Sequence, residues 1–149
     1  MKRLAILAVA LLGAVGATVA EAAVKNYSGT TSADDPVGLK VDSKGRVYAF
    51  YFVDVHLTCS DGDEFDTGPD PIKTPTSKRY KVVKRKFKIK IREEDAGRGY
   101  DVAGKFSAGR KTVGGTFRIF ANFDESFNPD PNGSAKCTSG VLKWSAKRK

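Results

Sequence analysis

The chain contains a single histidine, His56, and only two cysteines, Cys59 and Cys137. Nucleophilic triads require a histidine that contacts the nucleophile and is oriented by a carboxylate, and a catalytic zinc ion requires three protein ligands. The sequence also has no G-x-S-x-G motif, which presents the nucleophilic serine of α/β-hydrolases. These absences weigh against both kinds of enzyme. They leave one candidate for a small hydrolase, in which His56 acts with Asp54, two residues earlier on the same strand face.

Long apolar runs are missing except at the N-terminus, where the 17 residues from 4 to 20 carry no charge. The run follows two basic residues and precedes several alanines, which is the order of a secretory signal peptide. A membrane anchor is the competing interpretation, but a span needs about 20 strongly apolar residues and this run contains two glycines. We therefore predict a signal peptide over residues 1–22, with cleavage after Ala20 as the alternative. We expect a secreted or cell-envelope bacterial protein without stable membrane insertion after its removal.

Helical periodicity is also missing, since no stretch of residues 23–149 keeps it over three turns. Segments rich in Val, Ile, Phe, Tyr and Thr instead alternate with polar residues between Gly, Pro, Asp and Asn clusters, which is typical of strands and turns. The predicted strands are 24–29, 37–41, 46–59, 64–66, 80–83, 86–91, 100–106, 112–123 and 137–146. They predict a single all-β domain over residues 23–149: an antiparallel β-sandwich of about eight or nine strands, or alternatively a closed β-barrel.

The two cysteines predict one disulfide bond, because exported proteins meet an oxidising environment. Cys59 and Cys137 are 78 residues apart. For a cross-link that closes a loop of that length, the chain-entropy relation gives a stabilisation of the folded state of about 4 kcal/mol. A catalytic thiol is the alternative, but it needs a partner histidine, and only His56 is present.

Short segments around the glycines, cysteines and tryptophan carry a resemblance. They are Tyr27-Ser28-Gly29-Thr30, Cys59-Ser60-Asp61-Gly62, Gly104-Lys105-Phe106, Gly114-Gly115-Thr116-Phe117, and Cys137-Thr138-Ser139-Gly140 ahead of Trp144. In this arrangement the chain resembles a loose group of small exported bacterial β-domain proteins of unknown function. The resemblance implies a disulfide-linked β domain and transfers no catalytic or binding residue.

Basic residues dominate the segment from 78 to 92. Alternate residues of a strand project from one face about 6.5 to 7 Å apart, a spacing that suits repeated phosphates or sulfates. We predict a polyanion-binding set, which comprises Lys84, Lys86, Lys88, Lys90 and Arg92. Lysines that protect an edge strand from pairing are the competing explanation. Nucleic acid is not expected as the partner, since no recognition helix or single-strand motif accompanies the run.

A second charged run, from 61 to 66, is acidic. Calcium prefers several carboxylate oxygens on a flexible turn, so Asp61, Asp63, Glu64 and Asp66 form the candidate set for a calcium ion. The run departs from the EF-hand pattern after its second acidic position. A solvated loop is the alternative, and no other cofactor is expected.

Alternating strand directions predict a polarised molecule. The acidic turns near 34, 62, 94 and 127 fall at one end, and the basic turns near 45, 76 and 110 fall at the other with the C-terminal tail. The net charge of residues 23–149 is +8, from 24 basic and 16 acidic residues. These features favour a non-catalytic extracellular or envelope-associated domain that binds an anionic surface polymer. The His56 and Asp54 hydrolase and a structural or assembly protein are the alternatives, and the oligomeric state is not predicted.

Overall fold

The computed structural model describes residues 24–68, 72–73, 77–126 and 128–149, so the predicted signal peptide over residues 1–22 lies outside the described residues. The described part of the chain forms strands and one short 3-10 helix, η1 (Glu94–Ala96). The strands are β1 (Lys25–Thr31), β2 (Pro36–Val41), β3 (Val47–Phe52), β4 (His56–Cys59), β5 (Glu64–Asp66), β6 (Ile72–Lys73), β7 (Lys86–Glu93), β8 (Arg98–Phe106), β9 (Thr112–Phe123), β10 (Ala135–Thr138) and β11 (Leu142–Arg148). The all-β prediction is confirmed.

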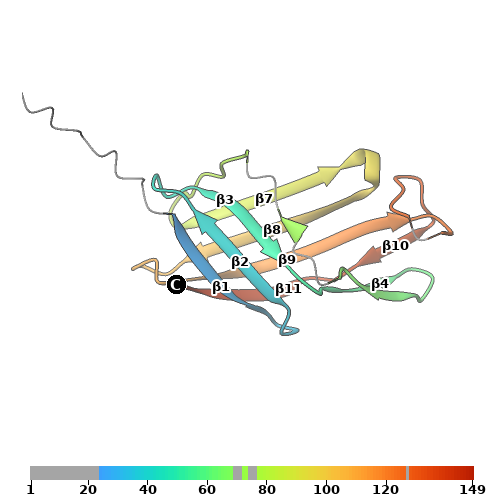
Figure 1. Cartoon of the computed structure of the whole chain (residues 1–149), viewed down its shortest axis with the longest axis horizontal. Helices are drawn as coiled ribbons and strands as arrows, with labels where there is room; N and C mark the ends of the chain where they lie inside the picture. Colours follow the sequence, from blue (N-terminus) through green and yellow to red (C-terminus); the bar gives the residue numbers. More distant parts are fainter. Residues whose placement is uncertain (1–23, 69–71, 74–76, 127) are drawn as a thin grey trace, which may run out of the picture.

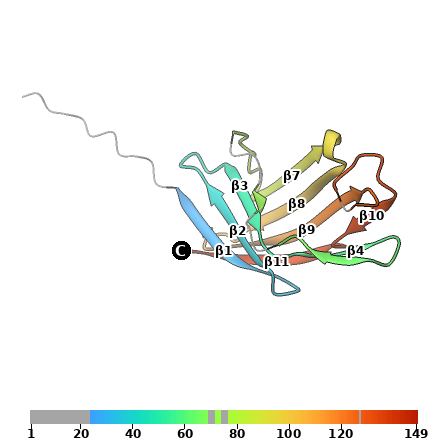
Figure 2. The same cartoon turned by 45° about the vertical axis from the view of Figure 1, so that its right-hand side comes forward.

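All of these strands belong to one antiparallel, strongly curled open sheet. Its order runs β5-β4-β10-β9-β11-β1-β2-β3-β6, with β8 on the other edge of β9 and β7 beyond β8. In Figures 1 and 2, β1, β2 and β3 rise steeply from β11 and cross the direction of β7, β8 and β9. The sandwich prediction is corrected to a half-barrel, because hydrogen bonding continues through β9 where a sandwich requires two separate sheets.

Strand β9 holds the sheet together because two strands share one of its edges. Its first half pairs with β11, from Thr112 to Phe117, and its second half pairs with β10, from Phe120 to Phe123. Its other edge pairs with β8 along nine residues. The sheet therefore divides at β9 into a β11-β1-β2-β3 arm and a β10-β4-β5 arm.

The curled sheet encloses a core that a flat sheet of this size leaves open. Phe50 on β3 is buried and packs against Trp144 on β11 and Phe117 on β9, with ring centroids 5.1 and 5.5 Å away. The indole N–H of Trp144 donates to the carbonyl oxygens of Ala103 and Thr116 at 3.1 and 3.2 Å. Rings from opposite sides of the curve thus meet on the inner face, which buries the apolar surface that a second sheet covers in a sandwich.

The single long strand predicted over 46–59 is wrong, because two backbone irregularities interrupt it. Lys40 is opposite Ala49 and Val41 is opposite Val47, so Tyr48 is the extra residue of a bulge. Asp54 then has a φ of 53°, a left-handed conformation that ends the strand. Beyond it the chain crosses to the other arm and continues as β4.

The strand predicted over 137–146 is likewise two strands, since Ser139, Gly140 and Val141 separate β10 from β11. Gly140 has a φ of 63°, which glycine adopts without steric cost. This break lets consecutive strands pair with successive halves of β9.

A tight turn separates the two segments predicted as strands over 80–83 and 86–91. Val83 and Lys86 exchange two backbone hydrogen bonds of 2.9 Å. Lys84 and Arg85 between them have φ values of 48° and 68°, so both central residues are left-handed. Beyond the turn, β7 alternates between buried and exposed positions along its first seven residues.

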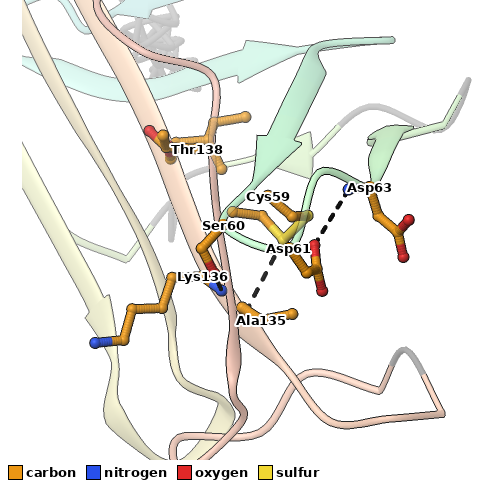
Figure 3. Close-up of a disulfide and its surroundings, with 9 residues drawn as sticks. Cys59, Ser60, Asp61, Asp63, Ala135, Lys136 and Thr138 are labelled. Carbon is orange, nitrogen blue, oxygen red and sulfur yellow. Dashed lines mark hydrogen bonds between the residues drawn. A yellow bond between two sulfur atoms is a disulfide. The ribbon is translucent and has the colours of Figure 1, made fainter.

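The predicted disulfide bond is present and joins β4 to β10 within the smaller arm. Cys59 and Cys137 are directly opposite in the antiparallel register, with Cα atoms 3.8 Å apart. Figure 3 shows the bond beside the turn that carries Asp61 and Asp63, with Ser60 close to Lys136. The Ser60 hydroxyl accepts a hydrogen bond of 3.1 Å from the Lys136 backbone N–H. The two strands of this arm are therefore held together by a covalent bond as well as by their short paired region.

The predicted polarity of the main turns agrees with the observed pairing. The guanidinium of Arg110 lies against Gly45, and the Lys111 carbonyl accepts a 2.8 Å hydrogen bond from Arg148 N–H, so basic turns and tail gather at one end. At the far end of β9, Ala121 is opposite Cys137, and Cys137 is opposite Cys59, the residue that precedes the 60–63 turn. The 34–35 turn lies closer to the middle, because Thr31 is opposite Trp144 and Trp144 is opposite Gly115.

Candidate anion-binding face

The lysines of β7 lie on its solvent side, as predicted. Lys86, Lys88 and Lys90 are exposed, while Phe87, Ile89 and Ile91 between them are buried. Lys84 precedes them in the tight turn and is also exposed. Within the described residues β7 pairs only with β8, so it is an edge strand of the sheet. This position alone agrees equally well with anion binding and with edge protection.

Further basic side chains occupy the same outer surface on strands that are not at the edge. Lys105 on β8 is opposite Lys86, Arg118 on β9 is opposite Asp101, and Lys143 on β11 is opposite Thr116. With the β7 lysines they form what we call the basic face: Lys86, Lys88, Lys90, Lys105, Arg118, Lys143 and Lys147. The last four were not among the residues predicted from the sequence, because only strand pairing brings them beside β7. The alternation of apolar and polar residues along each strand does predict that these side chains face the solvent.

The lysines of the basic face have no acidic partner among the described residues, for which every ion pair involves arginine or His56. Lys86 and Lys105 are a directly opposed pair of like charges, an arrangement that destabilises a sheet. The charge of these lysines is therefore available to an external anion.

Arg92, in contrast, has a structural role. Its Nη2 donates to Asp101 Oδ1 at 2.8 Å and its guanidinium lies 4.6 Å from the centroid of the Phe120 ring. Arg118 donates to the other oxygen of Asp101 at 3.1 Å. Partial burial opposes ionisation of Asp101, but the hydrogen bonds and charges of the two arginines outweigh it and lower the pKa of its carboxyl. Arg92 is thus the member of the predicted set that is already engaged.

The surface between the basic side chains is hollow, because the residues beneath it are small. One hollow of about 250 Å³ has Ala103 and Thr116 in its floor and Lys88, Lys90 and Arg118 among its lining residues. A second hollow is lined by Gly114 and Ser145 together with Arg85 and Lys105. The two hollows therefore combine hydroxyl groups and glycines with cationic side chains, and the Asp101 carboxylate also lines the first of them.

His56 contacts a different carboxylate from the one expected. Its Nδ1 lies 3.1 Å from Asp66 Oδ1 and its Nε2 lies 3.7 Å from Glu64 Oε2, while Asp54 occupies the turn before β4. The nearby hydroxyl of Ser139 accepts a hydrogen bond from Ile119 N–H and donates one to the Gly140 carbonyl. In the part of the chain that the structure describes, no hydroxyl group is hydrogen-bonded to His56.

The four predicted calcium ligands separate into two pairs. Asp61 and Asp63 lie in the β4–β5 turn, where Asp61 Oδ1 accepts the Asp63 N–H at 3.2 Å, as Figure 3 shows. Glu64 and Asp66 project from β5 toward His56. No group of three or more potential metal-ligating side chains is assembled among the described residues. Calcium binding here stays a prediction from the sequence.

No helix in the described part of the chain is long and apolar enough to cross a membrane. Comparisons of the chain with models of protein families, with curated proteins and with solved structures found no match.

Proposed function

We propose that this protein is an exported, non-catalytic domain that binds an anionic polymer of the cell surface through its basic face. The single observation that carries the proposal is the placement of unpaired lysines on interior strands as well as on the edge. Lys105 lies on β8 and Lys143 on β11, and each of these strands has a neighbour on both sides. Protection of a sheet edge explains the lysines on β7, but it does not explain those on β8 and β11.

The spacing of the charges favours a repeating anion over a single small one. Residues two apart on a strand are about 6.5 to 7 Å apart, and neighbouring strands are about 4.8 Å apart. Lys88 and Lys143 lie in one cross-strand row on either side of Ala103 and Thr116, so about 14 Å separates their backbones. Cationic groups spread at such intervals match successive phosphates or sulfates of a polymer.

Location outside the cytoplasm is part of the proposal. It rests on the predicted signal peptide and on the Cys59–Cys137 bond, since disulfides are rare in reducing compartments. Fractionation of the native host, with the mass of the mature N-terminus determined, tests this part. A cytoplasmic protein that retains residues 1–22 contradicts it.

The binding test compares two variants of equal net charge. The face variant carries Lys88→Gln, Lys105→Gln and Lys143→Gln, and the control carries Lys40→Gln, Lys44→Gln and Lys136→Gln, three exposed lysines outside the basic face. Retention on immobilised dextran sulfate and on polyphosphate is measured from low to high salt. We expect the face variant to elute at clearly lower salt, with the slope of log K against log salt reduced by about 2, because each lost contact removes about 0.7 to 0.9.

Equal weakening by both variants contradicts the proposal, because the net charge alone then explains retention. Unchanged retention of the face variant at every salt concentration contradicts it as well. Circular dichroism and thermal unfolding of each variant establish that the fold is intact.

A further inference from the structure

Another hollow lies on the opposite, inner side of the sheet and differs in character from the basic face. It has a volume of about 290 Å³ and opens between the β4–β5 hairpin and the ends of β8 and β9. Its walls are mostly apolar and include Phe52, Leu57, Phe65, Tyr100, Ile119 and Phe123, whereas Thr67, Glu93 and Arg98 are its polar lining residues.

The pocket exists because the sheet divides at β9. The smaller arm ends in β5, which is only three residues long, so Phe65 is the single side chain that this strand directs against the core. Phe65 packs edge to face on Phe123 with ring centroids 4.8 Å apart and stays partly exposed. On the other wall, the Tyr100 hydroxyl is uncharged at physiological pH, and burial is the main cause that raises its pKa further above the ordinary value of 10.0. The interior walls are therefore largely aromatic, and the charged lining residues Glu93 and Arg98 lie at the mouth.

The mouth of the pocket carries two opposite charges that neutralise each other. Arg98 donates through Nε to Glu93 Oε2, and both side chains are about half exposed at 54% and 41%. The two terminal nitrogens of Arg98 have no partner among the described residues. Their N–H groups can therefore donate to an oxygen atom of a ligand at the mouth. The acidic turns at this end of the molecule, which include Glu94 and Asp124, disfavour an anionic ligand.

We infer that this pocket binds a small uncharged amphiphile, with an apolar tail among the aromatic rings and one hydroxyl or carbonyl oxygen at Arg98. The volume supports a molecule of this size, since a dry apolar cavity of about 150 Å³ accommodates benzene. A pocket of 290 Å³ therefore takes a medium-length alkyl chain or a ring with a short chain. The inference is independent of the proposed function, because the pocket and the basic face lie on opposite sides of the sheet.

The test uses octan-1-ol, octanoate and the disulfide-bonded protein, with binding followed by calorimetry and by chemical shifts of the amides around the pocket. We expect saturable binding of octan-1-ol, at least fivefold tighter than binding of octanoate. Ala121 lines the pocket and is 5% exposed, so Ala121→Leu fills the space and is expected to abolish binding. A second variant, Phe65→Ala, serves if the filled variant does not fold, because Phe65 is partly exposed. It is expected to weaken binding of octan-1-ol at least fivefold.

The matched control for Phe65→Ala is Phe120→Ala, which removes an aromatic ring from the outer face of β9. It is expected to change the affinity less than twofold. Absence of saturable octan-1-ol binding, octanoate binding as tight as octan-1-ol binding, or equal affinities for the Phe65→Ala and Phe120→Ala variants overturns the inference. Each of these outcomes leaves polymer binding by the basic face untouched.

Discussion

Lys86 and Lys105 stand directly opposite each other on β7 and β8, with their side chains on the same solvent face. The next pair along this face with two charged members, Lys90 and Asp101, has opposite signs. Like charges that face each other across two strands destabilise a sheet, whereas opposite charges contribute about 0.2 to 1 kcal/mol. The Lys86–Lys105 pair therefore reduces stability where the proposed polymer site lies.

Replacement of Lys105 by Glu is expected to stabilise the fold by about 0.5 kcal/mol at low salt, because it converts a repulsive pair into an attractive one. The gain is expected to disappear at 1 M salt, where screening is nearly complete. Thermal unfolding at several salt concentrations measures both effects. The same variant is expected to bind dextran sulfate more weakly, and a variant that binds as tightly as the native protein contradicts the proposed site.

The tight turn between β7 and the preceding segment is expected to accept a more stable sequence. Lys84 and Arg85 both have positive φ, a conformation that costs residues with a Cβ about 1 kcal/mol each. The double variant Lys84→Asn and Arg85→Gly has the preferred pair for this turn type. We expect it to raise the free energy of unfolding by about 1 kcal/mol in urea titrations. A loss of stability indicates that these side chains make stabilising contacts, contrary to this interpretation.

Removal of the disulfide bond through Cys59→Ala and Cys137→Ala is expected to cost about 4 kcal/mol of unfolding free energy. The cross-linked residues are 78 positions apart, and the entropic restriction of the unfolded chain grows with loop length. The β4–β10 register contains only two residue pairs, Cys137 with Cys59 and Thr138 with Thr58, so few hydrogen bonds remain to hold this arm. Urea unfolding of the native protein with and without reductant is the control, and a difference below about 1 kcal/mol contradicts the expectation.

Gly115 is expected to tolerate no side chain, although its backbone lies in an ordinary strand. A Cβ at this position comes 1.9 Å from the Ala103 carbonyl oxygen, which belongs to a fixed neighbouring strand and also accepts the indole N–H of Trp144. We expect Gly115→Ala to cost about 3 kcal/mol or to prevent folding, because the strands must separate. Gly109→Ala is the control, since a Cβ there meets only the Lys111 side chain at 3.9 Å, and its unfolding temperature is expected to stay close to that of the native protein.

Asp101 is expected to make the stability depend on pH. Burial opposes its charge, but the hydrogen bonds from Arg92 and Arg118 lower its pKa below the ordinary value of 3.8. The stabilisation is therefore complete above pH about 4 and is lost as the pH falls through the lowered pKa of the folded protein. At pH 7 we expect Asp101→Asn to cost about 1 to 2 kcal/mol. The difference between the native protein and the variant is expected to shrink below pH 4, and a difference that stays constant down to pH 2 contradicts the assignment.

The local patterns in the sequence determined those strands whose alternation is uninterrupted. The predicted 112–123 strand has the observed bounds of β9, and apolar residues that alternate along it, such as Phe117 and Ile119, are buried. The lysine parity of β7 and the disulfide partners were predictable for the same reason, since alternation and the number of cysteines are properties of the chain alone. Part of the candidate site was therefore visible as a run of alternating lysines.

Strand partners and breaks were decided only by the tertiary structure. The sequence around Tyr48 and Asp54 contains no turn signal strong enough to predict the bulge and the left-handed residue that divide this apolar run. These irregularities are favourable because of the packing that they allow. The register also decided that Lys105 and Lys143 flank the same surface as Lys88, because residues far apart in the chain become neighbours only through backbone pairing. The curl has the same origin: β9 is long enough to pair with β11 and β10 in succession, so hydrogen bonding continues around one sheet and its own inner face encloses the core.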